Sequence, residues 1–207
     1  MGITGLLPTL QSITSQRHLS QYSGLLAGVD AMGWLHRSVH SSTAAESISL
    51  AFAQHAPDDP RAPPPSTSDR PPTYLSKTLS RCALLSSHGL IPLLVIDGAS
   101  LPGKKHTDKQ RKKERRKAFD IALAMKEQQP PPPAGQLHKL FARSLSVTHE
   151  MRQELICELH SKGIQFMVAP YEADAQLAFL SRTCLIDVVV TEDGDSLAYV
   201  RERSEQK

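Results

Sequence analysis

The sequence predicts an α/β domain with a mostly parallel central sheet and helices on both faces. Four apolar runs rich in Val, Ile and Leu are typical of strands buried on both faces of a parallel sheet. Segments with helical spacing separate these runs, which favours a doubly wound order. Acids follow each run, and ligands of such sheets bind beyond the carboxyl ends of the strands. These acids are Asp30, Asp97, Glu172, Asp174, Asp193 and Asp195.

The expected elements alternate along the chain. A short helix is expected within residues 2–16, and strands are expected at 25–30, 91–96, 164–168 and 186–190. Longer helices are expected at 31–54, 73–88, 104–127, 148–162 and 171–182. In the first of these, Trp34, Leu35 and Val39 are spaced for a packed face.

Glycines and prolines mark where these elements end. Gly89 and Gly163 are suitable C-caps directly before the second and third strands. Seven prolines lie in residues 56–72, and four more occupy 130–133. Both segments are predicted to be extended or disordered inserts, and the second one ends the helix before it.

The charge is unevenly distributed. Between Lys104 and Lys117, nine basic and two acidic residues give +7, so the rest of the chain carries −4 of the net +3. An acidic body with one basic segment suits a metal-dependent enzyme that acts on a polyanion. A solvated helix face or a nuclear-import signal would explain the run equally simply.

The remaining composition excludes several classes of protein. No apolar run approaches the length of a transmembrane helix, and no secretory signal is visible, so no membrane contact is expected. Three cysteines without paired spacing indicate reduced thiols of the cytosol or nucleus rather than a zinc site.

Six acids at strand ends would repel one another unless hard cations were bound. Asp193 and Asp195, two apart in an extended segment, would share one side, whereas Glu192 would point away as a surface residue. Glu172 and Asp174 can line the same site only if they lie at the first turn of their helix. The pattern therefore predicts a divalent-metal site and phosphate chemistry.

Several longer motifs resemble the structure-specific 5′ nucleases, the superfamily of flap endonuclease and the xeroderma pigmentosum group G nuclease. The chain begins Met-Gly-Ile-Thr-Gly-Leu-Leu, and Val29-Asp30 is followed by Trp34-Leu35-His36. The segments 95–98, 169–178 and 191–198 are similar to further motifs of these nucleases. Two motifs are most similar to the exonuclease 1 branch of the superfamily. They are Leu101-Pro102 before Lys104-Lys105, and the segment 171–176, Tyr-Glu-Ala-Asp-Ala-Gln.

The resemblance implies a PIN-like nuclease domain that hydrolyses DNA from 5′ ends or at 5′ flaps with two Mg²⁺ ions, for which Mn²⁺ can substitute. The first ion would bind Asp30, Asp97, Glu172 and Asp174, and the second would bind Asp193 and Asp195. Lys104 and Arg111 would act on the scissile phosphate. Contacts with DNA are expected from Gly2, Met32, His36, Lys105, Lys112, Lys113 and Arg116. At Met32 the family usually carries an aromatic residue, which stacks on a base as methionine does not.

The resemblance also implies how the chain is organised. An N-terminal nuclease region at 1–99, a basic helical arch with the second insert at 100–135 and an internal region at 136–207 would form one incomplete domain. The family's last metal aspartate and its duplex-binding element are expected beyond Lys207, so we expect a C-terminal truncation and an incomplete second metal site. A monomer in the nucleus, acting in DNA repair, is expected.

Two other interpretations stay open at this point. The chain could be a catalytically weak or inactive DNA-binding fragment of such a nuclease. Strand-end aspartates also occur in metal-dependent phosphatases and RNases, although nine cations exceed what a single phosphate needs.

Overall fold

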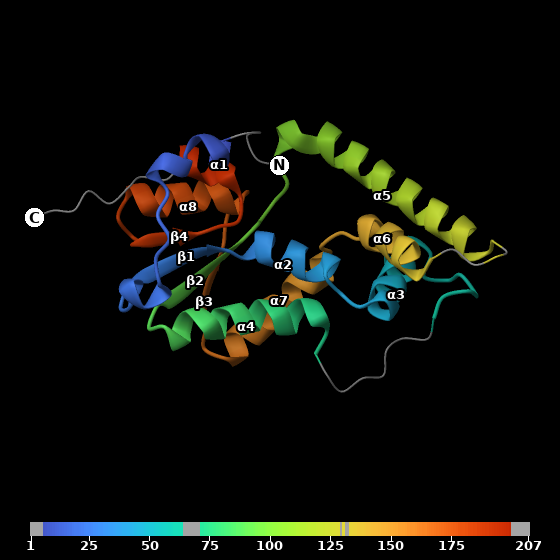
Figure 1. Ribbon diagram of the computed structural model, residues 1–207, viewed down its shortest axis with the longest axis horizontal. Coiled ribbons are helices and arrows are strands. Elements are labelled where there is room, and N and C mark those ends of the chain that lie inside the picture. The colour runs from blue at the N-terminus through green and yellow to red at the C-terminus, as the bar shows by residue number, and fades with distance from the viewer. Residues whose placement is uncertain (1–5, 64–70, 129, 131–132, 200–207) are drawn as a thin grey trace, which may run out of the picture. The chain divides into compact units, whose positions relative to one another are not determined.

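The computed structural model of the protein describes residues 6–63, 71–128, 130 and 133–199 (Figure 1). It contains two units, each assembled from separate stretches of the chain. Unit 1 comprises residues 1–34, 78–100 and 152–207, and unit 2 comprises residues 35–77 and 101–151. Among the described residues, every helix is too short or too polar to cross a membrane.

Unit 1 is built on a four-stranded parallel sheet with the order β3-β2-β1-β4. Its strands are β1 (Leu26–Asp30), β2 (Ile91–Ile96), β3 (Gln165–Val168) and β4 (Val188–Val190). In the register, Val29 lies between Leu94 of β2 and Val190 of β4. All four predicted strands are therefore confirmed, and their carboxyl ends meet at one edge of the sheet.

The strands differ in how deeply they are buried. Every residue of β1 after Leu26 is buried, whereas β4 is half-buried along its whole length. Val168 at the end of β3 is 50% exposed. The prediction that all four runs are buried on both faces is wrong for β3 and β4, because each is an edge of the sheet with a neighbour on one side only.

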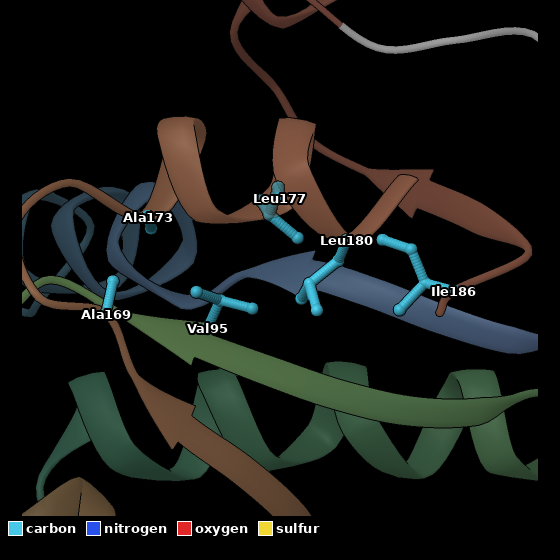
Figure 2. Packing of buried hydrophobic residues seen from close by; sticks show 6 residues of the cluster. All are labelled: Val95, Ala169, Ala173, Leu177, Leu180 and Ile186. Carbon is cyan, nitrogen blue, oxygen red and sulfur yellow. The ribbon is translucent and has the colours of Figure 1, made fainter. Parts of the chain in front are cut away.

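Helices cover both faces of the sheet, as predicted. On one face, Leu177 and Leu180 of α8 (Ala173–Arg182) pack with Val95 of β2 and Ile186, which precedes β4 (Figure 2). The parts of α4 (Thr73–Ser87) and α7 (His149–Ser161) that belong to unit 1 lie on the opposite face (Figure 1).

The segment before β1 is less regular than a single helix. It contains the short helix α1 (Leu6–Thr9), followed by the 3-10 turns η1 (Gln11–Ile13) and η2 (Leu19–Tyr22). Residues 14–16, included in the expected helix, are not helical, and residues 2–5 lie outside the described part of the chain.

The helix predicted at 31–54 is two helices, α2 (Ala31–His40) and α3 (Ala44–His55). The break follows from Thr43, whose side chain accepts a hydrogen bond from the Glu46 backbone N–H at 3.3 Å and thereby caps α3. Thr43 and Glu46 have the spacing of a capping box, a sequence signal that marks a helix start. Trp34, Leu35 and Val39 are buried, as predicted.

Unit 2 contains a helix that the sequence analysis missed. The 3-10 turn η3 (Pro102–Lys104) and α5 (Lys105–Lys126) match the predicted basic helix, but α6 (Ala134–Ser144) follows directly after the proline run. Phe141 of α6 packs with Phe52 of α3 and Phe119 of α5 in a buried aromatic cluster. Residues 64–70 of the first proline-rich insert lie outside the described residues.

Candidate metal centre

Four of the six predicted acids lie close together in unit 1. Asp30 is the last residue of β1, and Asp97 directly follows β2. Glu172 occupies the N-cap position of α8, and Asp174 lies in the first turn of that helix, where both acids can face one site. Asp97 and Asp174 raise the pKa of Asp30, and Asp174 and Glu172 raise that of Asp97, so the four acids lie within reach of one another's charge.

Asp30 is a buried carboxylate, with 9% of its surface exposed. The backbone N–H of Gly33, in the first turn of α2, donates to its Oδ1 at 3.0 Å. The pKa of Asp30 is raised to about 6, mainly by desolvation and also by the charges of Asp174 and Asp97, against the effect of the Gly33 hydrogen bond. Such a shift indicates that the negative charge of Asp30 is poorly compensated when no cation is bound.

Asp97 connects the end of β2 to the start of α8. The backbone N–H of Ala173 donates to its Oδ1 at 2.7 Å, so the carboxylate satisfies one of the unpaired donors at the helix N-terminus. Burial nevertheless raises the pKa of Asp97, and the charges of Asp174 and Glu172 add to that rise.

Gly98 allows two chain segments to approach at this point, a role that the sequence analysis missed. Its backbone N–H donates to the Tyr171 carbonyl at 2.7 Å, and the Ala99 N–H donates to the Pro170 carbonyl at 3.1 Å. A Cβ atom at position 98 would collide with the carbonyl oxygen of Ala169. Only glycine permits this contact, which holds the segment before α8 against the residue that follows Asp97.

The loop after β4 carries the remaining two acids. The Asp193 N–H donates to the Thr191 hydroxyl at 3.0 Å, and Asp195 lies on the 3-10 turn η4 (Gly194–Ala198). The structure describes Asp195 by its backbone alone. Their grouping at a second metal ion stays a prediction.

Ser196 links this loop to the first group of acids. It is buried, and its Oγ lies 3.3 Å from Asp174 Oδ1, to which it can donate. The sequence analysis missed Ser196, since a serine after the Asp-Gly-Asp motif carries no signal of a partner 22 residues away. Glu192 forms an ion pair with Arg81 at 3.0 Å, which agrees with its interpretation as a residue pointing away from the site.

The donor set fits a hard divalent cation. All candidate ligands are carboxylates, the oxygen donors that Mg²⁺ and Mn²⁺ prefer, and the raised pKa values of Asp30 and Asp97 agree with a site to which positive charge can be added. Among the described residues, no group of three or more acids, histidines or cysteines is arranged so that it could hold a metal ion as it stands. A cation would therefore have to draw the side chains together, or bind partly through water.

The predicted DNA contacts lie mostly on unit 2. Lys105, Lys112 and Lys113 of α5 are exposed, as are Lys104 on η3 and Arg111 on α5. Gly2 lies outside the described residues. Met32, which belongs to unit 1, is only 8% exposed, which leaves little surface for a base.

The side chain of Arg116 is engaged within unit 2. Its Nη1 donates to the His55 carbonyl at 2.6 Å, and its Nε pairs with Asp120 at 3.0 Å. The guanidinium also lies over the ring of Phe119. These contacts give Arg116 a role in holding α5 to α3, whether or not it also meets a phosphate.

His36 is exposed on α2 and stacks on His40 with ring centroids 6.5 Å apart. The pKa of His36 is lowered to about 4, mainly by desolvation and also by the charges of His40 and of two arginines on α5. The imidazole is therefore neutral at pH 7.

Comparison with known proteins agrees with this geometry. The sequence matches the XPG N-terminal domain over residues 1–118 and the XPG I-region over residues 163–203. Exodeoxyribonuclease 1 of Schizosaccharomyces pombe is 36% identical over 199 residues, which cover 96% of this chain and 31% of that protein. Exonuclease 1 of Xenopus laevis is 32% identical over 199 residues, covering 96% and 24%. The chain thus spans less than a third of the length of these curated relatives.

Solved structures support the fold. The catalytic core of Rad2 in complex with a DNA substrate has a TM-score of 0.57 at 22% identity, covering 95% of this chain and 48% of that one. Flap endonuclease-1 from Methanococcus jannaschii has a TM-score of 0.51 at 17% identity, covering 88% and 53%. These likenesses confirm the predicted nuclease fold. Since the XPG N-terminal domain alone accounts for more than half of the residues, and the I-region motif carries Glu172 and Asp174, this chain belongs to the XPG family.

Proposed function

We propose that this chain binds DNA and hydrolyses its phosphodiester bonds in a divalent-metal-dependent reaction, from 5′ ends in the 5′-to-3′ direction or at 5′ flaps. The observation that carries the proposal is the convergence of one buried and three half-buried carboxylates at the ends of β1 and β2 and the start of α8. The names of the curated relatives, exodeoxyribonuclease and exonuclease, support the same reaction. DNA repair in the nucleus is the role that we propose for it.

The four grouped acids would hold one Mg²⁺ or Mn²⁺, and Asp193 and Asp195 would contribute to a second. Bound there, the ions would supply Lewis acidity and lower the pKa of an attacking water. The chain's own contribution is to orient individual carboxylates, which a cation would then draw together. The Gly33 N–H orients Asp30, the Ala173 N–H orients Asp97, and Ser196 restrains Asp174.

The exposed cations of unit 2 would bind and orient the DNA. Lys104 and Arg111 would stabilise negative charge that develops on the scissile phosphate, and the guanidinium of Arg111 can do so with two parallel hydrogen bonds. Lys105, Lys112 and Lys113 would neutralise backbone phosphates without reading the base sequence. His36, as a neutral ring, would contact the exposed end of a duplex.

The test is cleavage of a 5′-labelled recessed duplex and of a 5′-flap duplex by the 207-residue chain. We expect cleavage with Mg²⁺ or Mn²⁺ and none with EDTA. Asp174→Asn is expected to leave at most a few per cent of that activity, while Asp58→Asn, an exposed acid away from the strand ends, leaves it unchanged.

DNA binding without cleavage in either metal would contradict the proposed hydrolysis and favour a DNA-binding role. Cleavage by Asp174→Asn at the wild-type rate would remove this acid from the metal site. Cleavage of RNA and not DNA would overturn the proposed substrate.

A further inference from the structure

A half-buried arginine contacts the backbone of one of the grouped acids. Arg152 is the fourth residue of α7, and its Nη1 lies 3.4 Å from the backbone carbonyl oxygen of Asp97, to which it donates a long hydrogen bond. Its Nε is buried and has no hydrogen-bond partner among the described residues. Neither the metal ligands nor the basic helix α5 includes this residue.

The position of Arg152 is unfavourable unless negative charge compensates for it. A half-buried guanidinium loses part of its hydration, and its buried Nε, a donor without a partner among the described residues, adds to that cost. The compensating charge comes from the carboxylates, since Arg152 lowers the pKa of Asp97 while burial and the other acids raise it. The guanidinium contacts the carbonyl of Asp97 rather than its carboxylate, so it leaves the carboxylate to other ligands.

We propose that Arg152 is a positioning residue that holds the carboxyl end of β2 and acts as the fixed counter-charge of the acid cluster while no cation is bound. The inference rests on the proposed binding of a divalent cation at these acids. An arginine remains protonated throughout the useful pH range, so its charge acts in the metal-free and the metal-bound protein alike.

A fixed positive charge near the ligands has two opposite effects. In the metal-free protein it reduces repulsion among the carboxylates and stabilises the fold. In the metal-bound protein it repels the cation and weakens binding. Removing the charge should therefore destabilise the metal-free protein and, at the same time, tighten its affinity for Mg²⁺. A purely structural arginine would produce the first effect without the second.

The experiment measures Mg²⁺ binding to the 207-residue chain by calorimetry, without DNA, together with thermal unfolding in EDTA. Arg152→Met removes the charge and keeps an unbranched side chain of similar reach. We expect a lower melting temperature in EDTA and a dissociation constant for Mg²⁺ that falls on the order of tenfold, because a charge acting through a partly buried site is only moderately screened.

Two control variants separate charge from shape. Arg152→Lys keeps the charge and loses the planar fork, so its affinity for Mg²⁺ should stay within about twofold of wild type because the long-range Coulomb term is retained. Arg182→Met makes the same charge change at an exposed position on α8, where solvent and salt screen it, and should leave both measurements unchanged.

The outcomes distinguish this inference from the proposed function. If the wild-type chain binds no Mg²⁺, the proposed function fails. If the wild type binds and Arg152→Met binds equally or more weakly, the counter-charge role is overturned. If Arg152→Met does not fold, it is combined with Asp30→Asn, which removes one repelling carboxylate. Recovery of folding supports the inference, and persistent failure to fold contradicts it.

Discussion

At the scale of single residues, the site is defined by carboxylates held in unfavourable surroundings. Asp30 is nearly inaccessible to water, and the backbone donor at Gly33 only partly offsets the loss of hydration and the repulsion from its neighbours. The fold holds these ligands partly through backbone contacts such as the hydrogen bond from the Ala173 N–H to Asp97. The site is therefore built at the expense of stability in the metal-free state.

This strain predicts a specific pH dependence. The pKa of Asp30 is about 6 in the folded protein, compared with 3.8 for an unperturbed aspartate, which stands for the unfolded chain. Between these two pH values, the folded form binds the proton more tightly than the unfolded form. In EDTA, stability should consequently fall as pH rises from about 4 to about 6 and remain low above that range. Each pKa unit corresponds to about 1.4 kcal/mol, which gives a penalty on the order of 3 kcal/mol at neutral pH.

Asp30→Asn should remove this penalty while keeping an oxygen acceptor for the Gly33 N–H. We expect its melting temperature in EDTA at pH 7.5 to exceed that of wild type by about 6–12 °C, given ~2–4 °C per kcal/mol for a chain of this size. Asp58→Asn, at an exposed acid, should show no such gain. A variant at position 30 that melts at or below the wild-type temperature at pH 7.5 would contradict the repulsion described here.

At the scale of elements, α5 has two functions along one helix. Its first half presents exposed cations such as Lys112 and Lys113, whereas its second half carries Ala118, Phe119 and Ala122 into the core of unit 2. Arg116 lies at the junction and is engaged by His55 and Asp120. A charge substitution at Arg116 would mix an effect on binding with an effect on packing.

The DNA-binding role of α5 is therefore best tested at Lys112 and Lys113. Affinity for duplex DNA should fall steeply with salt concentration, and each lost phosphate contact should reduce the slope of log K against log salt by about 1. Lys112→Glu with Lys113→Glu should reduce the slope by about 2 without altering sequence preference. The same charge change at exposed Lys139 and Arg143 on α6 is the control. Equal slopes in all three proteins would leave the basic run as a solvated face or an import signal.

The helix α6 should be as important to unit 2 as the helices predicted from the start. Phe141 is fully buried between Phe52 and Phe119, so Phe141→Ala should lower the free energy of unfolding by about 3–5 kcal/mol through lost burial and a cavity. Phe179→Ala makes the same truncation on α8, where the ring is 55% exposed, and should cost much less. Urea titration of both variants measures the difference. Similar losses would mean that the aromatic cluster does not hold unit 2 together.

At the scale of the whole molecule, the proposed chemistry is divided between two units. The acids lie in unit 1, on a parallel sheet, and the exposed cations of α5 lie in unit 2. Each unit has its own core, around Leu177 and Val95 in the first and around Phe119 in the second. Cation binding should consequently be a property of unit 1 that needs no DNA.

Mg²⁺ should stabilise the whole chain by mass action. At a concentration about 100 times the dissociation constant, binding adds about 2.7 kcal/mol to the free energy of unfolding. The melting temperature should thus rise with Mg²⁺ concentration and return to its starting value when EDTA is added. Asp30→Asn should abolish most of this rise although it melts higher in EDTA, whereas Asp58→Asn should retain it. A melting temperature that does not respond to Mg²⁺ would argue against a cation site in this chain.

The sequence alone determined the type of fold and predicted which acids would be grouped. Apolar runs indicate buried strands because helices cover both faces of a parallel sheet, so that its strands need apolar side chains on both sides. Parallel strands also bring their carboxyl ends to the same edge of the sheet, where ligands bind. Asp30, Asp97, Glu172 and Asp174 could be grouped on that reasoning. Two further patterns in the sequence indicate structure that the predicted elements left out. Thr43 and Glu46 have the spacing of a capping box, which indicates the start of α3, and Leu137, Leu140 and Phe141 have the spacing of one helix face, which indicates α6.

Only the tertiary structure decided how the site is supported. It brought the Ala173 N–H to the Asp97 carboxylate, the Ser196 hydroxyl to Asp174 and the Arg152 guanidinium to the Asp97 carbonyl. It also made β3 and β4 the edge strands of the sheet. Such contacts join residues far apart in the chain, and their existence depends on distances of a few tenths of an ångström between packed elements. Local periodicity carries no information on those distances. In the sequence, Arg152 looks like any other polar residue of a helix. Only the fold brings its guanidinium to the backbone of Asp97.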